Sequence, residues 1–196
     1  MASADDQPGC SYAVVMPESV RVSEMRSLQS IFKLLSVMAF VAATNSAQAD
    51  HLPGPVGDVL LTIKGQMEHG NMPDGAQFDL GMLRNIGVVT FSTSTPWTEG
   101  VQDFTGLPLN QLLAHIGAQA AKLTVTAVNE YQIDIPASDA MDGGPILAWE
   151  QGGKLLSVRE KGPLWLVYPF DSKREYRSEQ FHARAVWQVV QIDLKP

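Results

Sequence analysis

The stretch FTGLPLNQLLAHIGAQAAKLTVTAV, residues 104–128, contains the clearest helix pattern and the clearest strand pattern of the chain. Its first half spaces leucines and an isoleucine three and four residues apart, with Pro108 near the start and Gly117 at the end, which predicts a helix. Its second half, residues 122–128, alternates apolar side chains with threonines, as a half-buried strand does. The stretch therefore favours a domain that mixes helix and strand.

Shorter segments on both sides of this stretch alternate between strand patterns and turn residues. The chain holds 16 glycines and 12 prolines, and so many turn residues favour a strand-rich domain over a helical bundle. A short helical turn is expected over 78–84, with Asp79 in the capping position. We therefore predict a single compact α+β domain, built on a mixed β-sheet with a few short helices. Further strands are expected at residues 59–64, 88–92, 131–135, 146–149, 164–168 and 186–194.

The segment MRSLQSIFKLLSVMAFVAATNSAQA, residues 25–49, has the three parts of a secretory signal peptide in the right order. Arg26 and Lys33 supply the positive start, residues 34–43 form an almost unbroken apolar run, and the segment ends in the small-x-small pattern A-Q-A. A buried core helix is the alternative, but the order of the three parts favours the signal peptide. We expect cleavage after Ala49 and export, into the periplasm if the source is a Gram-negative bacterium.

Residues 1–24 precede a good start methionine, and we interpret them as an upstream extension from a start site assigned too early. The working domain is then residues 50–196. The single cysteine, Cys10, lies before this domain, so we expect the exported chain to contain no disulfide. No later apolar run reaches the length of a membrane span, which predicts no span in the exported chain.

Net charge and motif content argue against several classes of function. The chain carries 14 basic and 21 acidic residues, for a net charge of −7, and this balance argues against a nucleic-acid partner. The four histidines lack the close spacing of a zinc site, and we interpret them as incidental. The sequence has neither a G-x-S-x-G nucleophile elbow nor a glycine-rich phosphate loop. We therefore assign no residue as catalytic and none as a metal ligand.

The run STSTPWT, residues 92–98, follows an expected strand and places several hydroxyl groups beside the indole of Trp97. Adaptable donors and acceptors next to a flat aromatic face suit a planar heterocyclic ligand. The alternative is a polar loop with Trp97 in the core. Residues 129–131, NEY, end another expected strand and would add a second ring and polar groups. Trp187 stands near the start of the last strand, and we interpret it as a core residue.

A succession of short segments carries a family resemblance: LTIKG (61–65), FDLGML (78–83), FSTSTPW (91–97), FTGLPLNQLLAHIG (104–117), AVNEYQIDIP (127–136), LAWEQGGKLL (147–156), GPLWLVYP (162–169) and RAVWQVVQIDL (184–194). In this order they resemble the sulfite-oxidase-like molybdopterin oxidoreductase domain, which implies a compact mixed domain around a β-sheet. Enzymes of that family hold molybdenum through a cysteine thiolate, and Thr93 stands near that position here. A hydroxyl is a poor substitute for a soft thiolate. Trp165 stands where an arginine is common, and no arginine follows Thr93 in its loop.

Without the metal ligand and the phosphate-binding arginines, the chain is most similar to the small exported pterin-binding proteins of this fold, the PruR type. That resemblance implies a non-catalytic periplasmic receptor for a reduced pterin, with no molybdenum. It also implies a partner, the periplasmic domain of a membrane-bound cyclic-di-GMP signalling enzyme. A molybdopterin-dependent oxidoreductase without the cysteine, and a structural adaptor with no ligand, are the alternatives.

A pterin is a flat bicycle with an amide-like edge, so its site needs an aromatic stack and hydrogen-bonding groups. A base stacked on an aromatic side chain gains about 1–3 kcal/mol, and Trp97 and Tyr131 are the expected stacking residues. Glu130 and Asp134 are the expected acceptors for the N–H groups of the ligand, with a solvated strand face as the alternative. The remaining polar lining is expected from Thr93, Ser94, Thr95 and Arg184.

Overall fold

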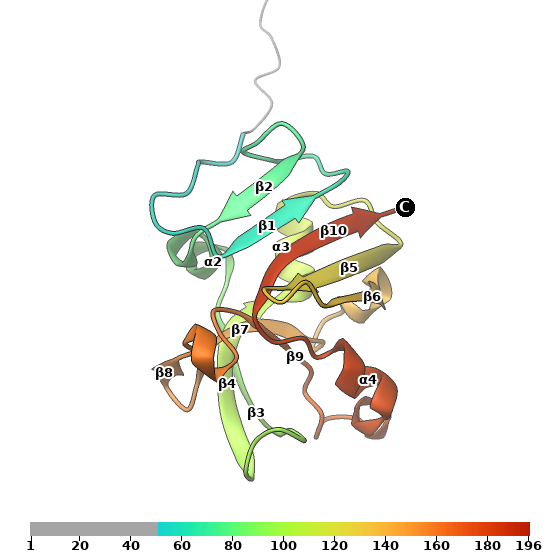
Figure 1. Ribbon diagram of the computed structural model, residues 1–196. Helices are drawn as coiled ribbons and strands as arrows, with labels where there is room; N and C mark the ends of the chain where they lie inside the picture. Colours follow the sequence, from blue (N-terminus) through green and yellow to red (C-terminus); the bar gives the residue numbers. More distant parts are fainter. Residues whose placement is uncertain (1–50) are drawn as a thin grey trace, which may run out of the picture. The chain divides into compact units, whose positions relative to one another are not determined.

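The computed structural model describes residues 51–196, so the expected signal peptide (25–49) and upstream extension (1–24) lie outside the described residues. Two five-stranded sheets form the framework of this part of the chain (Figure 1). In the first sheet the order is β2 (Gly75–Phe78), β1 (Leu61–Lys64), β10 (Val189–Lys195), β5 (Lys122–Ala127) and β6 (Gln132–Pro136). In the second sheet the order is β3 (Val89–Ser94), β4 (Val101–Pro108), β7 (Ile146–Gln151) and β8 (Lys154–Leu155), with β9 (Trp165–Val167) also paired to β7.

Short helices connect and flank these sheets. They are α2 (Leu80–Ile86), α3 (Leu109–His115), α4 (Glu179–Arg184) and the 3-10 turns η1 (Ala137–Asp139), η2 (Val158–Glu160) and η3 (Arg174–Arg177). The pair β1–β10 is parallel, whereas every other named strand pair of the described chain is antiparallel. The predicted α+β domain with mixed pairing and few helices is therefore confirmed. Within residues 51–196, no helix combines the length and the apolar character needed to cross a bilayer.

One hydrophobic core joins the two sheets through α3. Leu109 and Leu112 of that helix, and Ile116 directly after its last residue, are fully buried, at the helical spacing read from the sequence. They pack in the same cluster as Ile63 of the first sheet and Leu147 of the second. The expected alternation of residues 122–128 is also confirmed, because the apolar residues of β5 are buried between less buried neighbours.

Asp79 caps α2 as predicted. Its carboxylate accepts the backbone N–H of Met82 at 2.8 Å, inside the first turn of the helix, and those of Val56 and Gly57 at 2.8 Å each. These N–H groups, that of Gly57 first, hold the pKa of Asp79 below its ordinary value, because hydrogen bonds to the charged form stabilise it. The cap thereby ties the chain before β1 to the start of α2.

Three strands, β2, β4 and the two-residue β8, and the helix α4 were not predicted from the sequence. The strand β4 contains Asp103, Gly106 and Pro108, which are poor strand formers. Gly106 is required where β4 pairs with β7, because a Cβ there would lie 2.2 Å from the carbonyl oxygen of Leu147. The strand β2 has four residues and no clear alternation, and α4 has only six residues.

Candidate functional site

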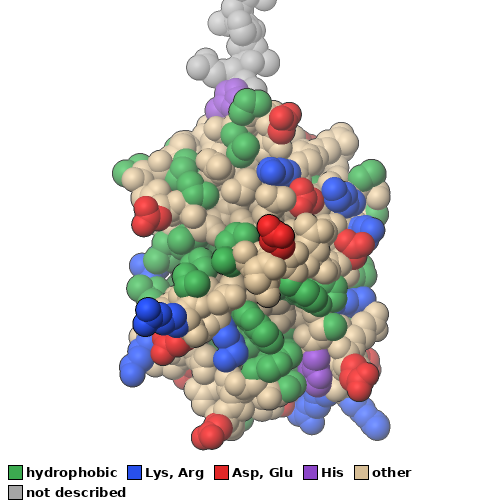
Figure 2. Space-filling view, in the orientation of Figure 1, with side chains coloured by type: hydrophobic (Ala, Val, Ile, Leu, Met, Phe, Trp, Pro, Cys, Tyr) green, Lys and Arg blue, Asp and Glu red, His purple; other side chains and the backbone are tan. Residues whose placement is uncertain are grey.

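A cavity of about 330 Å³ opens between α4, the β5–β6 turn, the loop after β3 and the segment before β10. The helix α4 packs beside β6, although the two are distant in sequence (Figure 1). Figure 2 shows hydrophobic side chains exposed together in the lower half of the same face. Aromatic and small apolar residues dominate the lining, which comprises Trp97, Ala127, Asn129, Tyr131, His182, Ala183, Ala185, Val186 and Trp187.

Trp97 is the centre of an aromatic cluster at this cavity. Its ring centroid lies 5.5 Å from that of Trp187 and 5.9 Å from that of His182, both in edge-to-face geometry. On its inner side the centroids of Trp165 and Phe170 lie at 6.0 and 6.2 Å. These are favourable aromatic separations. Trp97 therefore packs against the core and also lines the cavity, and its contact with a ligand stays a prediction.

Trp187 is not a core residue, contrary to the interpretation drawn from its sequence position. Its side chain is 37% exposed and lines the cavity. The next residue, Gln188, has a φ of 57° in the left-handed region, so the chain turns just before β10 begins. Tyr131, on the opposite segment, is 48% exposed and also lines the cavity. Two large rings thus remain accessible to a flat ligand.

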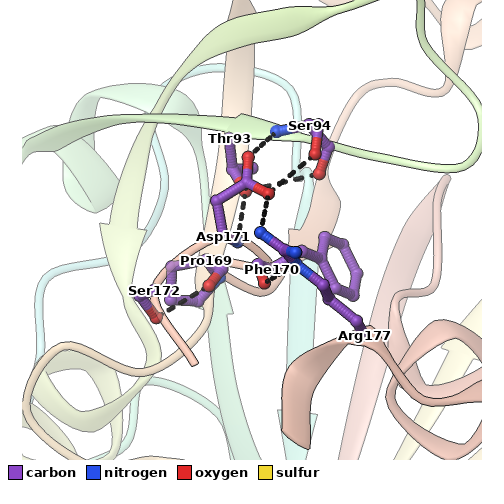
Figure 3. Close-up of polar contacts among 7 residues, drawn as sticks. All are labelled: Thr93, Ser94, Pro169, Phe170, Asp171, Ser172 and Arg177. Atoms are coloured by element: carbon purple, nitrogen blue, oxygen red, sulfur yellow. Dashed lines mark hydrogen bonds and ion pairs between the residues drawn. The ribbon is translucent and has the colours of Figure 1, made fainter. Parts of the chain in front are cut away.

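The carboxylate of Asp171 fixes the end of β3, from which the Trp97 loop departs (Figure 3). It accepts the backbone N–H and the hydroxyl of Ser94, the latter at 2.8 Å, and it pairs with Arg177 at 2.9 Å. The backbone N–H of Asp171 donates to Oγ1 of Thr93 at 3.1 Å. The hydrogen bonds from Ser94, and then the charge of Arg177, hold the pKa of Asp171 below its ordinary value.

Thr93, Ser94 and Thr95 position the loop and are absent from the cavity lining. Thr93 is completely buried, and Ser94 is engaged by Asp171. Oγ1 of Thr95 accepts the backbone N–H of Trp97 at 3.2 Å and lies 2.9 Å from Oγ1 of Thr98. The hydroxyl groups that the sequence offered as ligand contacts therefore make intramolecular hydrogen bonds that hold the Trp97 loop.

Arg184 lies in a buried polar group that anchors α4. Its Nη1 pairs with Oδ2 of Asp139 at 2.9 Å, and both side chains are nearly buried, at 12% and 11% exposed. The hydroxyl of Tyr168 donates to the same oxygen at 2.8 Å. Burial, and then the adjacent Asp139 carboxylate, raise the pKa of Tyr168, so it remains a protonated donor. Because α4 supplies His182 and Ala183 to the cavity, this group holds that wall in place.

Glu130 and Asp134 lie outside the cavity lining. Glu130 is exposed at the β5–β6 turn, with a φ of 67°. Asp134 lies on an exposed face of β6, where it accepts from Nζ of Lys122 at 2.8 Å and from the hydroxyl of Thr124. The hydrogen bond from Lys122 is the main reason why the pKa of Asp134 is lowered. Asn129 is the polar side chain that this turn contributes to the lining instead.

Three contributors to the site were not identified as such from the sequence. His182 was interpreted as incidental, yet its ring lines the cavity and contacts Trp97. Asp171 and Asp139 contact residues that are distant in the sequence; Ser94, for example, precedes Asp171 by 77 residues. No sequence motif near either aspartate indicates these contacts. For His182 the available signal was its position two residues before Arg184, in a segment already considered for the site.

The site does not fit a molybdenum centre of the type that the family resemblance implies. Thr93 stands near the expected position of the cysteine, and its hydroxyl lies 3.4 Å from a carboxylate oxygen of Asp171 in a fully buried setting. A hydroxyl held in this way lacks the soft thiolate that the metal requires. Within residues 51–196, no group of three or more His, Cys, Asp or Glu side chains is arranged to hold a metal ion.

The described residues thus form an α+β domain with one cavity lined mainly by aromatic and small apolar residues. Residues 82–171 match the family model described as the oxidoreductase molybdopterin binding domain, which supports the sulfite-oxidase-like fold and agrees with a pterin-type ligand. A comparison with curated proteins gave no match. The matched range contains Trp97, Asn129 and Tyr131 and ends at Asp171, so His182 and Trp187 lie in the part of the cavity beyond it.

Proposed function

We propose that this chain is an exported, non-catalytic receptor for a reduced pterin. The observation that carries the proposal is the cavity of about 330 Å³ that is lined by the rings of Trp97, Tyr131 and Trp187. That volume is at the lower end of the range for small-molecule sites, which suits a bicyclic ring. Stacking of one flat ring on another contributes about 1–3 kcal/mol per contact.

Polar groups at the cavity suit the amino-pyrimidinone edge of a pterin. Oδ1 of Asn129 accepts the backbone N–H of Tyr131 at 3.2 Å, which orients the side-chain amide and leaves its NH₂ group as a donor. The His182 ring adds a nitrogen that donates or accepts according to its tautomer. A mostly apolar lining with a few polar groups is typical of small-molecule sites. The apolar groups match the shape of the ring, and the polar groups fix its orientation through hydrogen bonds to one edge.

The surroundings of Thr93 support the part of the proposal that assigns binding without catalysis. The position near which related enzymes hold molybdenum carries a buried hydroxyl in hydrogen-bonding contact with Asp171, and its partners serve to position the Trp97 loop. In the proposed receptor, the pterin-loaded form contacts the periplasmic domain of a membrane-bound cyclic-di-GMP enzyme. A signal requires that this partner prefer the loaded form over the empty form.

Titration of Trp97 and Trp187 variants with a tetrahydropterin under anaerobic conditions tests the proposal. Trp187→Ala should weaken binding about fivefold or more, because loss of one stacking contact amounts to about 1–3 kcal/mol. Trp97→Phe keeps an aromatic face and should retain most of the affinity, whereas Trp97→Ala should not. Val56→Ala, at a fully exposed position away from the cavity, is the control. Equal affinities for all four variants would refute the proposed site.

A further inference from the structure

A separate hollow of about 380 Å³ lies at the loop that joins β1 to β2 (Figure 1). It shares no lining residue with the aromatic cavity described above. Its lining brings together two thioethers, one imidazole and two carboxylates, and comprises His51, Gly65, Met67, Glu68, Gly70, Met72, Pro73, Asp74 and Gly75. These side chains are of the types that bind metal ions.

Backbone hydrogen bonds fix the chain on both sides of Met67. The backbone N–H of Gln119 donates to the carbonyl of Gln66 at 3.2 Å, and the backbone N–H of Glu68 donates to the carbonyl of Ile116 at 3.0 Å. The two neighbours of Met67 are thereby tied to the segment that follows α3. The first thioether of the hollow is held on a rigid part of the loop.

Met72 is held at the other end of the same loop. Its backbone N–H donates to the carbonyl of Gly75 at 3.2 Å, and the N–H of Gly75 donates back at 3.3 Å. The side-chain amide of Asn71 donates to the carbonyls of Gln77 and Pro53, at 2.8 and 2.9 Å. The second of these bonds ties the segment before β1 to the loop. Because the chain around the hollow is ordered in advance, a ligand would pay little to organise it.

His51 is oriented as metal-binding histidines are. Its Nδ1 lies 3.3 Å from the carbonyl oxygen of Gly70; a carbonyl only accepts, so Nδ1 carries the proton and Nε2 presents its lone pair. Metal-binding histidines almost always donate their second ring N–H in this way. The backbone N–H of Leu52 donates to the same oxygen at 3.1 Å, which holds this segment against the loop.

The methionines of the hollow are not explained by core packing alone. Met67 packs at the edge of the main core, whereas Met72 is half-buried and belongs to neither hydrophobic cluster of residues 51–196. The carboxylates of Glu68 and Asp74 take part in none of the ion pairs found in those residues. With these two carboxylates and neither lysine nor arginine in its lining, the hollow favours a cation.

We propose that this hollow binds copper(I), with Met67, Met72 and His51 as ligands. Thioethers are soft ligands that select Cu(I), and imidazole also suits copper. Zinc takes thiolate, imidazole and carboxylate ligands, and magnesium and calcium take oxygen ligands. The sequence-based expectation of no metal ligand rested on the spacing of the histidines and did not consider these two methionines. The proposal is independent of the pterin function.

Anaerobic competition with the chromophoric Cu(I) chelator bathocuproine disulfonate tests this site. Every protein sample carries Cys10→Ser, so that this thiol does not compete for the ion. The chain should remove one Cu(I) from the chelator, and X-ray absorption at the copper edge should show sulfur neighbours. An excess of Zn(II) should leave the titration unchanged, because zinc does not favour thioethers.

The double variant Met67→Leu/Met72→Leu should weaken Cu(I) binding about tenfold or more, since loss of even an outer contact of a metal site costs about 10–100-fold. Leucine nearly conserves the volume of methionine, and an unchanged urea midpoint checks the fold. His51→Gln, at an exposed position, should weaken binding as well.

Met141→Leu, at a 46% exposed methionine outside the hollow, is the matched control and should keep the wild-type affinity. Failure of the wild type to remove copper from the chelator would overturn the proposal. So would equal copper affinities of the wild type, the double variant and His51→Gln, or displacement of the copper by Zn(II).

Discussion

Replacing Asp171 by alanine removes the side chain that ties the end of β3 to the segment before η3. The carboxylate accepts two hydrogen bonds from Ser94 and pairs with Arg177. Hydrogen bonds to a charged group contribute about 1.5–3 kcal/mol, but this carboxylate is 32% exposed and Arg177 is 61% exposed, so the ion pair adds little. We therefore expect Asp171→Ala to lower the free energy of unfolding by about 2 kcal/mol.

Urea denaturation followed by tryptophan fluorescence measures this loss, provided that the slope of the transition is unchanged. Asp171→Asn should lose less, because its amide oxygen still accepts from Ser94. Asp142→Asn, at an exposed position in the turn after η1, is the control for removal of one negative charge. Because the Trp97 loop departs from Ser94, pterin affinity should fall together with stability in Asp171→Ala.

The effect of Asp171 should also depend on pH. Its pKa is lowered in the folded protein, so its contribution to stability is complete above the ordinary pKa of aspartate, about 3.9, and is lost as pH falls through the folded value. The difference between wild type and Asp171→Ala should be largest near pH 7 and shrink in strong acid. A difference below about 0.5 kcal/mol at pH 7 would refute the anchoring role, since random surface changes have effects of that size.

Two further substitutions test the anchors of the fold. Tyr168→Phe removes the donor to the nearly buried Asp139 carboxylate and should destabilise the protein by about 1–3 kcal/mol, measured by urea denaturation; an unchanged midpoint would contradict a role for this hydroxyl in holding α4. Asp79→Ala removes the α2 cap and the contacts to Val56 and Gly57, so its thermal midpoint should fall further than that of Asp58→Ala, a neighbouring exposed carboxylate. Equal midpoints for these two variants would show that the cap contributes nothing.

The parts of the fold that depend on local pattern were predictable from the sequence. The helix α3 and the strand β5 follow from residue spacing alone, and Asp79 caps α2 because a carboxylate just before a helix satisfies its free N–H groups. The strand β4 was not predictable, because pairing with β3 and β7 on both sides outweighs its unfavourable residues. For such a segment, tertiary contacts decide whether the residues form a strand.

The candidate site was predictable only in part, because it is assembled from distant segments. Trp97 and Tyr131 were identified from their positions after strands, and both line the cavity. Trp187 was misassigned because proximity to a strand suggests burial, whereas the left-handed backbone of Gln188 separates this ring from β10. Asp171 was missed because nothing in its neighbourhood indicates a partner 77 residues away.

Direct titration of the purified protein with a tetrahydropterin, under anaerobic conditions and followed by tryptophan fluorescence, tests the central claim of a pterin receptor. Tetrahydrolumazine has the same reduced bicyclic ring with an oxo group in place of the pterin amino group, and this form of lumazine serves as the control ligand. The account predicts saturable quenching at micromolar or lower pterin concentration, with weaker binding of lumazine. A flat pterin titration of a folded sample would contradict the claim.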